Sequence, residues 1–546
     1  MKEKQFTNSL RSEGSQPHLS DKQLYPWQEE CIQRWFRNDC RGMVQAVTGS
    51  GKTRLALAAA ERLQKSLPCP LRIRIVVPTG ALMRQWHRAA QDFLFSQDGA
   101  SSARGSQTGA VGMVGGGFQA EGDGFCTIYV INSARYRLAR QILADLKQGN
   151  AVLLIADECH RYASGQNRLI FEFLPYLKDA SSRFCSMGLS ATLPSGEALR
   201  FLSSALGRKI YSYGMAQAAS ARTICRYDLF HISLSFDQEE RDAYDELSDR
   251  LALLYATISK AAPSIHHMSQ TERFELLRRL AAGREPKTAQ AASQYMGLTY
   301  KRKNLVCLAS ARVSCALELL RLLPAHERIL VFGERISQAE ELYQLLQKAF
   351  PGRAARYHSQ MGRQANQNAL ERFRNGEVRI LITCKSLDEG LDVPEVSIGI
   401  ILSGTSTQRQ RIQRLGRIIR QKEGKSRSSL YYLHVSDTAE DSCFLPDAGK
   451  AVVSELGYDR DRRSFTNPPY EKAAFRLTER LERRGMNDAQ WNELLRCLRL
   501  GLIRCDWRLS QAWLRDRNRL AADTSEKNYW FCMEQLHRIS REGPDA

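Results

Sequence analysis

The chain has 546 residues, of which 43% are hydrophobic and 25% are charged, a composition typical of a globular protein with more than one folded domain. Lys and Arg outnumber Asp and Glu by 79 to 59, and the formal net charge of +20 favours a polyanionic partner, with a functionless basic surface as the alternative. The 14 cysteines show no Cys-x-x-Cys spacing, which argues against a disulfide framework and a structural zinc site and indicates a reducing cytosol.

No targeting or membrane-spanning segment is evident in the sequence. The first residues, Met-Lys-Glu-Lys-Gln-Phe, lack an apolar stretch of signal-peptide length. No later apolar run approaches the roughly 18 residues that a membrane span needs. We therefore expect a cytoplasmic protein that does not enter a membrane.

The residue types along the chain predict five regions. Residues 1–22 are polar and are expected to be a disordered lead-in. Short β-branched runs alternate with amphipathic stretches in residues 23–230 and again in residues 326–440, which predicts two α/β domains with parallel sheets. Residues 231–325 carry Glu, Arg and Leu at helical spacing and predict a helical linker or insertion. Residues 441–546 predict a small helical C-terminal domain.

Strands are expected where the β-branched runs occur. These runs are residues 43–47, 73–77, 127–131, 151–155 and 185–189 in the first domain, and residues 329–332, 378–382, 396–402 and 430–435 in the second. The Gly-rich residues 99–125 predict a surface loop or hairpin, because no strand and helix frame them as a second phosphate site would require. Beyond about residue 440 no strand is expected.

Residues 46–53, Ala-Val-Thr-Gly-Ser-Gly-Lys-Thr, lie between an apolar run and a helix-like stretch. This is the arrangement of a phosphate-binding loop, in which glycines allow a tight turn and backbone N–H groups point inward. The Lys side chain reaches the β- and γ-phosphates of a nucleoside triphosphate, and the final Thr hydroxyl ligates Mg²⁺. The strict pattern has Gly in place of Ala46. We assign nucleotide binding to Thr48, Gly49, Ser50, Gly51, Lys52 and Thr53.

Residues 153–160, Leu-Leu-Ile-Ala-Asp-Glu-Cys-His, form an apolar strand that ends in two carboxylates. The C-terminal end of a buried parallel strand opens onto the ligand-binding edge of its sheet. Asp157 can hold Mg²⁺ through its water shell, and Glu158 can orient or deprotonate the water that attacks the γ-phosphate. The alternative is an acidic helix cap after a strand, which the upstream phosphate loop disfavours.

With Asp-Glu-Cys-His at residues 157–160, the chain resembles the superfamily 2 helicases and nucleic-acid translocases. The resemblance implies an α/β fold with two tandem RecA-like domains, and ATP with Mg²⁺ as the cofactors. It implies that Gln28, in Leu-Tyr-Pro-Trp-Gln, reads the adenine base. It also implies that Ser190 and Thr192, in Ser-Ala-Thr, hydrogen-bond the acidic box, including His160, and couple nucleotide state to nucleic acid.

Two strand-to-helix turns resemble family elements that contact the nucleic-acid backbone. The first contains Val-Pro-Thr at residues 77–79, and the second spans residues 127–133. Helix starts with free N–H groups and hydroxyls suit phosphates, and ordinary helix caps are the alternative. The expected nucleic-acid contacts are Pro78, Thr79, Gln85 and Ser133.

Residues 380–394, in the second domain, resemble motif V of the family. This resemblance implies that Thr383 lies near nucleic acid. It also implies that Gly390 and Asp392 lie near the nucleotide.

Residues 410–420 resemble motif VI, whose Gln-Arg-x-Gly-Arg-x-x-Arg pattern is matched by Gln413, Arg414, Arg417 and Arg420. If the segment is helical, these arginines recur every three residues and project from roughly one side, as an arginine-finger array needs. A planar guanidinium suits the charge that spreads over transferring phosphoryl oxygens. A solvated basic helix is the alternative. We assign catalytic roles to Glu158, Gln413, Arg417 and Arg420.

The C-terminal region carries no convincing nuclease or methyltransferase motif. Its tryptophans could stack on single strands, but their helical spacing and Leu neighbours favour burial in a helical core. The tryptophans concerned are Trp491, Trp507, Trp513 and Trp530.

The resemblance covers residues 25–435 and is greatest to the XPB, UvsW and RadD-like branch, which generally works on DNA, often with 3′-to-5′ polarity. We therefore expect an ATP-dependent helicase or translocase in DNA repair, recombination or genome defence, including phage defence. Its expected partner is nucleic acid, with DNA favoured over RNA, and protein partners in a multi-subunit complex would fit this function. A nucleotide-gated recognition subunit without unwinding, or an RNA helicase, is the alternative.

Overall fold

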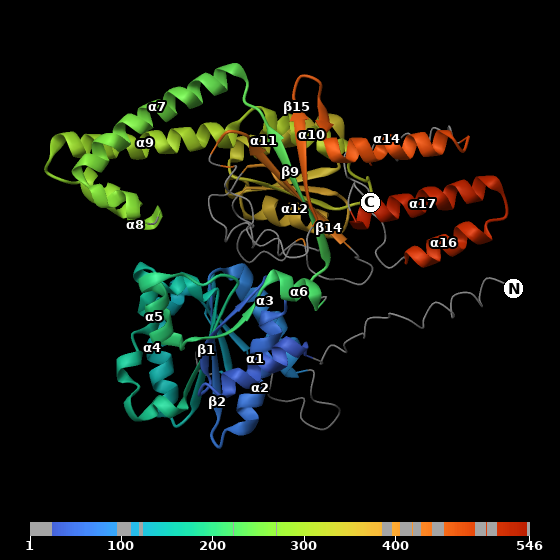
Figure 1. Ribbon diagram of the computed structural model, residues 1–546. Helices are drawn as coiled ribbons and strands as arrows, with labels where there is room; N and C mark the ends of the chain where they lie inside the picture. Colours follow the sequence, from blue (N-terminus) through green and yellow to red (C-terminus); the bar gives the residue numbers. More distant parts are fainter. Residues whose placement is uncertain are drawn as a thin grey trace. The chain divides into compact units, whose positions relative to one another are not determined.

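The computed structural model of the chain contains two compact units, which divide after Ala218 (Figure 1). The residues that it describes are 24–95, 111–119, 124–221, 223–268, 270–384, 396–403, 418, 427–438, 440, 452–485, 498 and 510–542. The predicted disordered lead-in at residues 1–22 lies outside them. Within these ranges, no helix is both long enough and apolar enough to cross a membrane.

The first unit is built on an eight-stranded sheet with the order β4-β3-β5-β2-β6-β7-β1-β8. Neighbouring strands are parallel, except that β3 and β4 form an antiparallel hairpin. The strands are β1 (Arg41–Ala46), β2 (Leu71–Val77), β3 (Val111–Gly115), β4 (Phe118–Gln119), β5 (Cys126–Val130), β6 (Ala151–Asp157), β7 (Phe184–Ser190) and β8 (Lys209–Tyr213).

All five strands predicted for the first domain are confirmed, and the Gly-rich segment contains the β3–β4 hairpin. The edge strand β8 has no counterpart among the predictions. Only Tyr213 of its five residues is buried, so this strand does not need the apolar run by which the other strands were predicted. By contrast, β6 and β7 are buried at every residue, as expected for central parallel strands covered on both faces.

Helices cover both faces of this sheet. Helices α1, α2 and α3 lie on one side, and α4 and α5 lie on the other (Figure 1). The bounds are α1 (Pro26–Phe36), α2 (Lys52–Ser66), α3 (Gly80–Phe95), α4 (Ile131–Lys147), α5 (Gly196–Leu206) and α6 (Met215–Ser220). Short 3₁₀ helices between β6 and β7 are η2 (Cys159–Ala163), η3 (Gly165–Phe171), η4 (Leu174–Tyr176) and η5 (Lys178–Arg183).

The second unit contains another eight-stranded sheet, with the order β11-β12-β10-β13-β14-β9-β15-β16. Its neighbours are parallel except for the β15–β16 pair. The strands are β9 (Arg226–Leu234), β10 (Ile329–Gly333), β11 (Ala354–Tyr357), β12 (Ile380–Cys384), β13 (Ile398–Ile401), β14 (Arg427–Val435), β15 (Val452–Asp459) and β16 (Ser464–Thr466). The four strands predicted for the second domain are β10, β12, β13 and β14.

Two sequence-based boundaries differ from the structure. The predicted end of the first domain at residue 230 falls inside β9, which pairs with β14 and β15 and so belongs to the second sheet. The expectation that strands cease beyond residue 440 is wrong, because β15 and β16 complete that sheet. β9 and β15 pair with segments far away in the sequence, and local residue patterns do not specify such partners.

Residues 231–325 are mainly helical after β9, as predicted, and α7 and α9 pack side by side (Figure 1). A capping box begins α7, since the Asp237 carboxylate accepts from the Glu240 N–H at 2.9 Å and the Glu240 side chain accepts from the Asp237 N–H. The helices and 3₁₀ turn of this region are α7 (Gln238–Ala261), η6 (Pro263–His267), α8 (Gln270–Ala281), α9 (Pro286–Leu308) and α10 (Ala311–Leu322). A small apolar cluster that includes Ile258, Ile265 and Leu277 joins α7, η6 and α8.

The second sheet is covered by α10 and α11 on one face and by α12 on the other (Figure 1). The main apolar core of this unit lies between the sheet and the α10–α11 layer. The remaining bounds are α11 (Ile336–Ala349), η7 (Ser359–Met361), α12 (Arg363–Arg374), α14 (Pro468–Glu482), α16 (Gln511–Leu520) and α17 (Thr524–Glu542).

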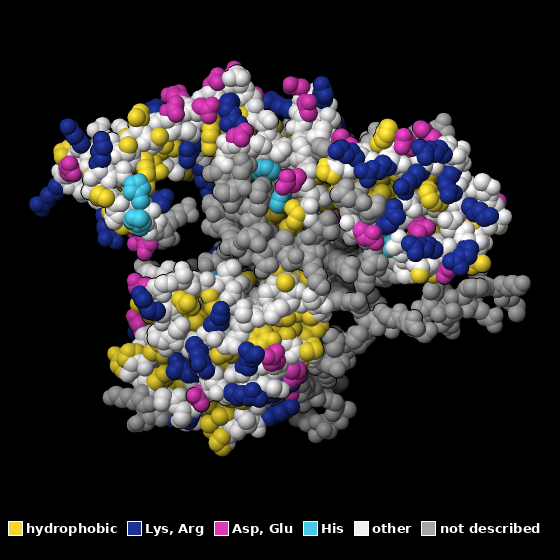
Figure 2. Space-filling view, in the orientation of Figure 1, with side chains coloured by type: hydrophobic (Ala, Val, Ile, Leu, Met, Phe, Trp, Pro, Cys, Tyr) yellow, Lys and Arg dark blue, Asp and Glu magenta, His cyan; other side chains and the backbone are white. Residues whose placement is uncertain are grey.

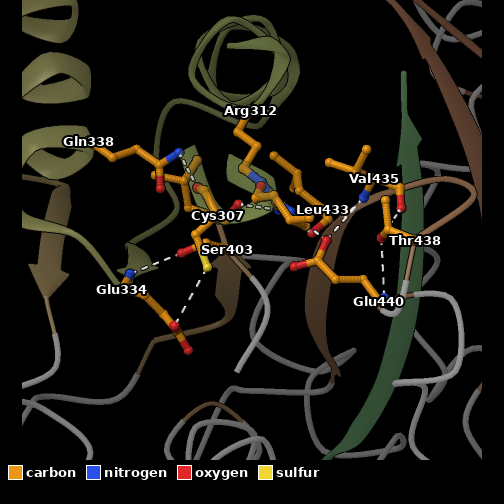
Figure 3. Close-up of polar contacts among 11 residues, drawn as sticks. Cys307, Arg312, Glu334, Gln338, Ser403, Leu433, Val435, Thr438 and Glu440 are labelled. Carbon is orange, nitrogen blue, oxygen red and sulfur yellow. Dashed lines mark hydrogen bonds and ion pairs between the residues drawn. The ribbon is translucent and has the colours of Figure 1, made fainter. Parts of the chain in front are cut away.

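A buried arginine fastens α10 to this core. The Arg312 guanidinium donates to the carbonyl oxygens of Val306 at 2.9 Å, Leu402 at 2.9 Å and Leu433 at 2.8 Å, and it pairs with the Glu440 carboxylate (Figure 3). Its side chain is fully buried. Because Leu402 and Leu433 follow or lie within β13 and β14, one side chain links α10 to the ends of two central strands.

The C-terminal helices α14 and α17 share a buried cluster that includes Tyr470, Leu477 and Leu536. Trp513 and Trp530 are half-buried and meet edge to face at 5.6 Å between ring centroids, outside that cluster, so the predicted core position holds only in part. Trp491 and Trp507 lie outside the described residues. Figure 2 shows Lys and Arg side chains spread over these helices together with acidic ones.

Candidate nucleotide-binding site

Three adjacent strands of the first unit carry the residues of the candidate site. β7 lies between β1 and β6 and runs parallel to both, so the C-terminal ends of all three strands meet at one edge. The phosphate loop follows β1, Asp157 ends β6, and Ser190 ends β7. The sheet topology therefore gathers three sequence motifs that are far apart in the chain.

The phosphate loop has the backbone that its glycines were expected to allow. Gly49 and Gly51 have φ angles of +85° and +91°, in the left-handed region that favours glycine. Lys52 begins α2, so N–H groups of the first helical turn have no partner within the helix. The Lys52 Nζ donates to the Ala46 carbonyl at 2.9 Å, and the Ser50 hydroxyl donates to the Val47 carbonyl at 2.7 Å.

Gln28 is fully buried against this loop. Its Nε2 donates to the Gly51 carbonyl at 2.9 Å, and its Oε1 accepts from the Tyr25 N–H at 2.9 Å. A Cβ atom at Gly51 would lie 2.8 Å from the Gln28 Nε2, so a side chain there would displace the Gln28 carboxamide. Gln28 thus joins the start of α1 to the phosphate loop. Its carboxamide keeps one N–H and one lone pair, and the predicted adenine recognition stays a prediction.

The acidic residues occupy the buried end of β6. The Asp157 Oδ2 accepts from the Trp86 indole N–H at 2.8 Å, and its Oδ1 accepts from the Glu158 N–H at 3.0 Å. Burial raises the pKa of Asp157 above its ordinary value, and the Trp86 bond and the charge of Lys52 oppose this rise. Glu158 has a φ of +48°, which is unusual for a residue with a side chain, and strained residues of this kind cluster at functional sites.

The predicted contact between Ser190 and the acidic box is present. The Ser190 Oγ lies 2.8 Å from the His160 Nδ1 and donates to the Thr192 carbonyl at 2.7 Å, so the imidazole supplies the proton of the first bond. The same Nδ1 lies 3.4 Å from the Glu158 carboxylate. Thr192 contributes to this network through its backbone, since its N–H lies 3.2 Å from the Ser190 Oγ.

The residues of the first unit that are expected to contact nucleic acid differ in their burial. Pro78 is buried, whereas Thr79, Gln85 and Ser133 are half-buried. The Thr79 hydroxyl accepts from the Leu82 N–H at 3.3 Å, which is the helix-cap alternative considered above. Their contacts with nucleic acid remain predictions.

Thr383 is buried in the second sheet, and its expected position near nucleic acid stays a prediction. It is 1% exposed, and its hydroxyl donates to the Val331 carbonyl at 3.2 Å within the second sheet. Thr383 is buried because it lies in the central strand β12, whose residues are all buried.

The other site residues predicted within motifs V and VI, Gly390, Asp392, Gln413, Arg414, Arg417 and Arg420, lie outside the described residues. Within motif VI the structure describes Ile418, which is buried and whose carbonyl accepts from the Ser428 hydroxyl at 2.9 Å. Ile418 also packs on β13 so closely that a Cβ atom at Gly399 would lie 2.0 Å from its Cδ1.

Two protein families match the chain. The res subunit of type III restriction enzymes matches residues 21–195, and the helicase conserved C-terminal domain matches residues 311–422. The first match contains the phosphate loop, the acidic box and Ser190, and the second contains motifs V and VI. Together the matches cover more than half of the chain. The chain belongs to the superfamily 2 helicases.

Sequence relatives assign this helicase to the XPB-like branch. It is 26% identical over 412 residues to the DNA 3′-5′ translocase XPB2 of Sulfurisphaera tokodaii, across 74% of the chain and 81% of that relative. It is 30% identical over 157 residues to the DNA 3′-5′ helicase XPB of Kineococcus radiotolerans, across 29% of the chain and 27% of that relative. The helicase therefore spans most of the first relative and about a quarter of the second.

Solved structures with a similar chain trace include the Hef helicase domain of Pyrococcus furiosus, at 15% identity and a TM-score of 0.47, covering 76% of this chain and 96% of that one. A second is S. cerevisiae Dbp5 bound to RNA and ADP BeF3, at 13% identity and a TM-score of 0.48, covering 81% and 94%. As a superfamily 2 helicase, the chain is an ATP-hydrolysing helicase or translocase.

Trp86 lies at the nucleotide site, although the sequence-based assignments did not place it there. It belongs to the α3 segment that was predicted to face nucleic acid, yet it is 1% exposed and binds the helicase's acidic box. Met83, Trp86 and Ala90 are all buried and recur at spacings of three and four residues. This helical spacing is the signal that could have indicated an inward-facing indole.

Proposed function

We propose that this helicase hydrolyses Mg²⁺-bound ATP at the phosphate loop of its first unit and uses the reaction to move along DNA. The observation that carries the proposal is the convergence of Lys52, Asp157, Glu158 and Ser190 at one edge of the sheet. Each lies at or just beyond the end of one of three adjacent strands. Groups for phosphate binding, metal binding, water activation and coupling are therefore neighbours.

The donor groups of the loop and of β6 fit a metal-bound triphosphate. The left-handed glycines and the N-terminus of α2 offer backbone N–H groups to phosphate oxygens, and Lys52 adds a positive charge. The Thr53 hydroxyl and the Asp157 carboxylate are the hard oxygen ligands that Mg²⁺ prefers. Mg²⁺ held by these two residues would neutralise negative charge on the phosphate oxygens.

Glu158 is the proposed base that orients the attacking water and accepts its proton. Its carboxylate lies 3.4 Å from the His160 Nδ1, which in turn lies 2.8 Å from the Ser190 Oγ. A change of charge at Glu158 would alter the hydrogen bond between His160 and Ser190. We therefore assign to His160 and Ser190 the transmission of the nucleotide state to the end of β7.

DNA is the proposed track because a relative that aligns with 74% of this chain is a DNA 3′-5′ translocase. We carry over its 3′-to-5′ direction as part of the proposal. The net charge of +20 adds attraction to a phosphate backbone that does not depend on base sequence.

The proposal is tested by measuring ATP hydrolysis by the full chain with single-stranded DNA, duplex DNA and RNA side by side. We expect DNA to stimulate turnover more than RNA does. Displacement of a third strand from a DNA triplex would report translocation, and strand separation would report unwinding. Stimulation by RNA alone would overturn the choice of DNA, and DNA-stimulated hydrolysis without movement would favour a nucleotide-gated recognition subunit.

The site assignment is tested by two substitutions. Lys52→Ala removes the charge that holds the phosphates, so we expect loss of both nucleotide binding and hydrolysis. Glu158→Gln keeps the side-chain shape without the base, so we expect nucleotide binding to persist while turnover falls by at least about 100-fold. Glu172→Gln, at an exposed carboxylate of the same unit, is the matched control. Wild-type turnover in Lys52→Ala or Glu158→Gln would sink the assignment.

A further inference from the structure

We propose that Trp86 is a positioning residue that holds the metal-binding carboxylate of Asp157 and links it to helix α3, so that nucleic acid on α3 is sensed at the metal site. The contact that carries this inference is the 2.8 Å hydrogen bond from the indole N–H to the Asp157 Oδ2. The inference rests on the proposed function, because it assigns a second task to the same site.

The hydrogen bond restricts the carboxylate to one orientation. Trp86 donates to Oδ2, while the Glu158 N–H donates to Oδ1 at 3.0 Å, so each oxygen has a defined partner. Each oxygen retains lone-pair capacity for the water shell of a cation. The indole has a single N–H group, and this group donates to Asp157. Removing that N–H would leave the buried carboxylate held only through its Oδ1, so that its orientation would be less restricted.

Helix α3 connects this bond to the predicted nucleic-acid side of the unit. It begins directly after Pro78 and Thr79, and its next turns carry Gln85 and Trp86 next to each other. The seven residues from Gly80 to Trp86 form about two turns, or roughly 10 Å of helix. A shift of the start of α3 would therefore move the indole relative to Asp157.

A second tether holds the end of β6 through its backbone. The Tyr162 hydroxyl lies 2.6 Å from the Asp157 carbonyl oxygen and 3.0 Å from the Val76 carbonyl oxygen, which ties the ends of β6 and β2 together. This tether fixes the backbone of Asp157 but not its carboxylate. Trp86→Phe would therefore remove the side-chain link while leaving the backbone tether and most of the packing in place.

The first unit also offers a matched control. Trp35 is fully buried, and its indole N–H donates at 2.9 Å to the Ser186 carbonyl, in the first half of β7. Trp35→Phe deletes the same N–H and the same volume, but its partner is a backbone carbonyl remote from the strand end. Comparing the two variants separates the metal site from a general loss of packing.

The experiment measures two quantities in wild type, Trp86→Phe and Trp35→Phe. One is the Mg²⁺ concentration that half-saturates binding of a fluorescent ATP analogue, and the other is the ratio of DNA-stimulated to basal turnover. For Trp86→Phe we expect the Mg²⁺ requirement to rise by about tenfold, the usual effect of removing a group that orients a metal ligand. We also expect the stimulation ratio to fall, while Trp35→Phe leaves both quantities as in wild type.

An unchanged Mg²⁺ requirement in Trp86→Phe, or equal changes in both variants, would overturn the inference. If the Mg²⁺ requirement rises but the stimulation ratio holds, the link to α3 is overturned. Absence of DNA stimulation in the wild type would instead count against the proposed function. The Mg²⁺ titration would still decide whether Trp86 positions Asp157.

Discussion

The Ser190 hydroxyl group connects the acidic box to the Ser-Ala-Thr segment. It accepts a hydrogen bond from His160, donates to the Thr192 carbonyl and stands at the end of a strand buried throughout its length. His160 in turn lies within 3.4 Å of Glu158. At the scale of single residues, the proposed base therefore reaches the Ser-Ala-Thr segment through two side-chain contacts.

Replacement of Ser190 by alanine tests this connection. Ser190→Ala removes the oxygen that accepts from His160 but none of the groups that hold phosphates or water. We expect ATP hydrolysis to continue within about tenfold of wild type, while the distance moved along DNA per ATP falls sharply. Triplex displacement measured together with phosphate release gives this ratio.

Ser204→Ala, on α5, is the control, because its hydroxyl only donates to the Phe201 carbonyl of its own helix. Equal loss of hydrolysis and movement in Ser190→Ala would mean that Ser190 serves the chemical step rather than the coupling.

At the scale of elements, α10 depends on a polar attachment inside an apolar core. Arg312 is fully buried, and its partners are three carbonyl oxygens and the Glu440 carboxylate, which is itself 13% exposed at the side chain. Removing one member of a buried ion pair leaves an uncompensated charge, which costs more than the pair contributes. The attachment matters for the fold because Leu402 and Leu433 belong to the ends of β13 and β14.

Arg312→Met should therefore destabilise the second unit. We expect the free energy of unfolding to fall by about 3 to 5 kcal/mol, since the carbonyl groups and Glu440 lose their donor inside the protein. Urea denaturation followed by fluorescence would measure this change. Arg321→Met, on the same helix, is the control, because Arg321 is 45% exposed at the side chain and its ion pair with Glu318 should contribute less than about 1 kcal/mol. Similar losses in the two variants would show that Arg312 is not a structural attachment.

At the scale of the whole molecule, the two units carry different parts of the predicted chemistry. The first holds the phosphate loop and the acidic box, and the second contains the motif VI sequence with its arginines. Motif VI is anchored at Ile418, whose carbonyl accepts from Ser428 and whose side chain packs on β13. A separate family model matches within each unit.

The sequence of the second unit leads to a prediction for Arg417 and Arg420. If their guanidinium groups stabilise the transferring phosphoryl group, Arg417→Ala or Arg420→Ala should leave ATP binding nearly intact and lower turnover by about 1,000-fold or more. Fluorescent-nucleotide binding and phosphate release would be measured on the same preparation. Arg374→Ala, on α12 of the same unit, controls for the loss of one positive charge. Parallel loss of binding and turnover would argue against a finger role.

Much of the fold and of the nucleotide site was predictable because it depends on local sequence. Residue type and spacing alone predict a loop with glycines before Lys52 and an apolar strand that ends in Asp157. The nine predicted strands lie at positions where the structure contains strands. The errors occurred where distant segments pair. β9 and β15 belong to the second sheet because they pair with strands far away in the sequence, and the local residue pattern does not identify those partners.

By itself, the sequence determined which chemical groups the protein has and the order in which the motifs occur, since residue type and short spacing suffice for both. Only the tertiary structure decided what those groups touch. It placed Trp86 on Asp157, Gln28 on Gly51 and the Thr383 hydroxyl on a strand carbonyl. The physical reason is that a buried hydrogen bond depends on side-chain direction and on the approach of separate elements, and both are set by packing of the whole unit.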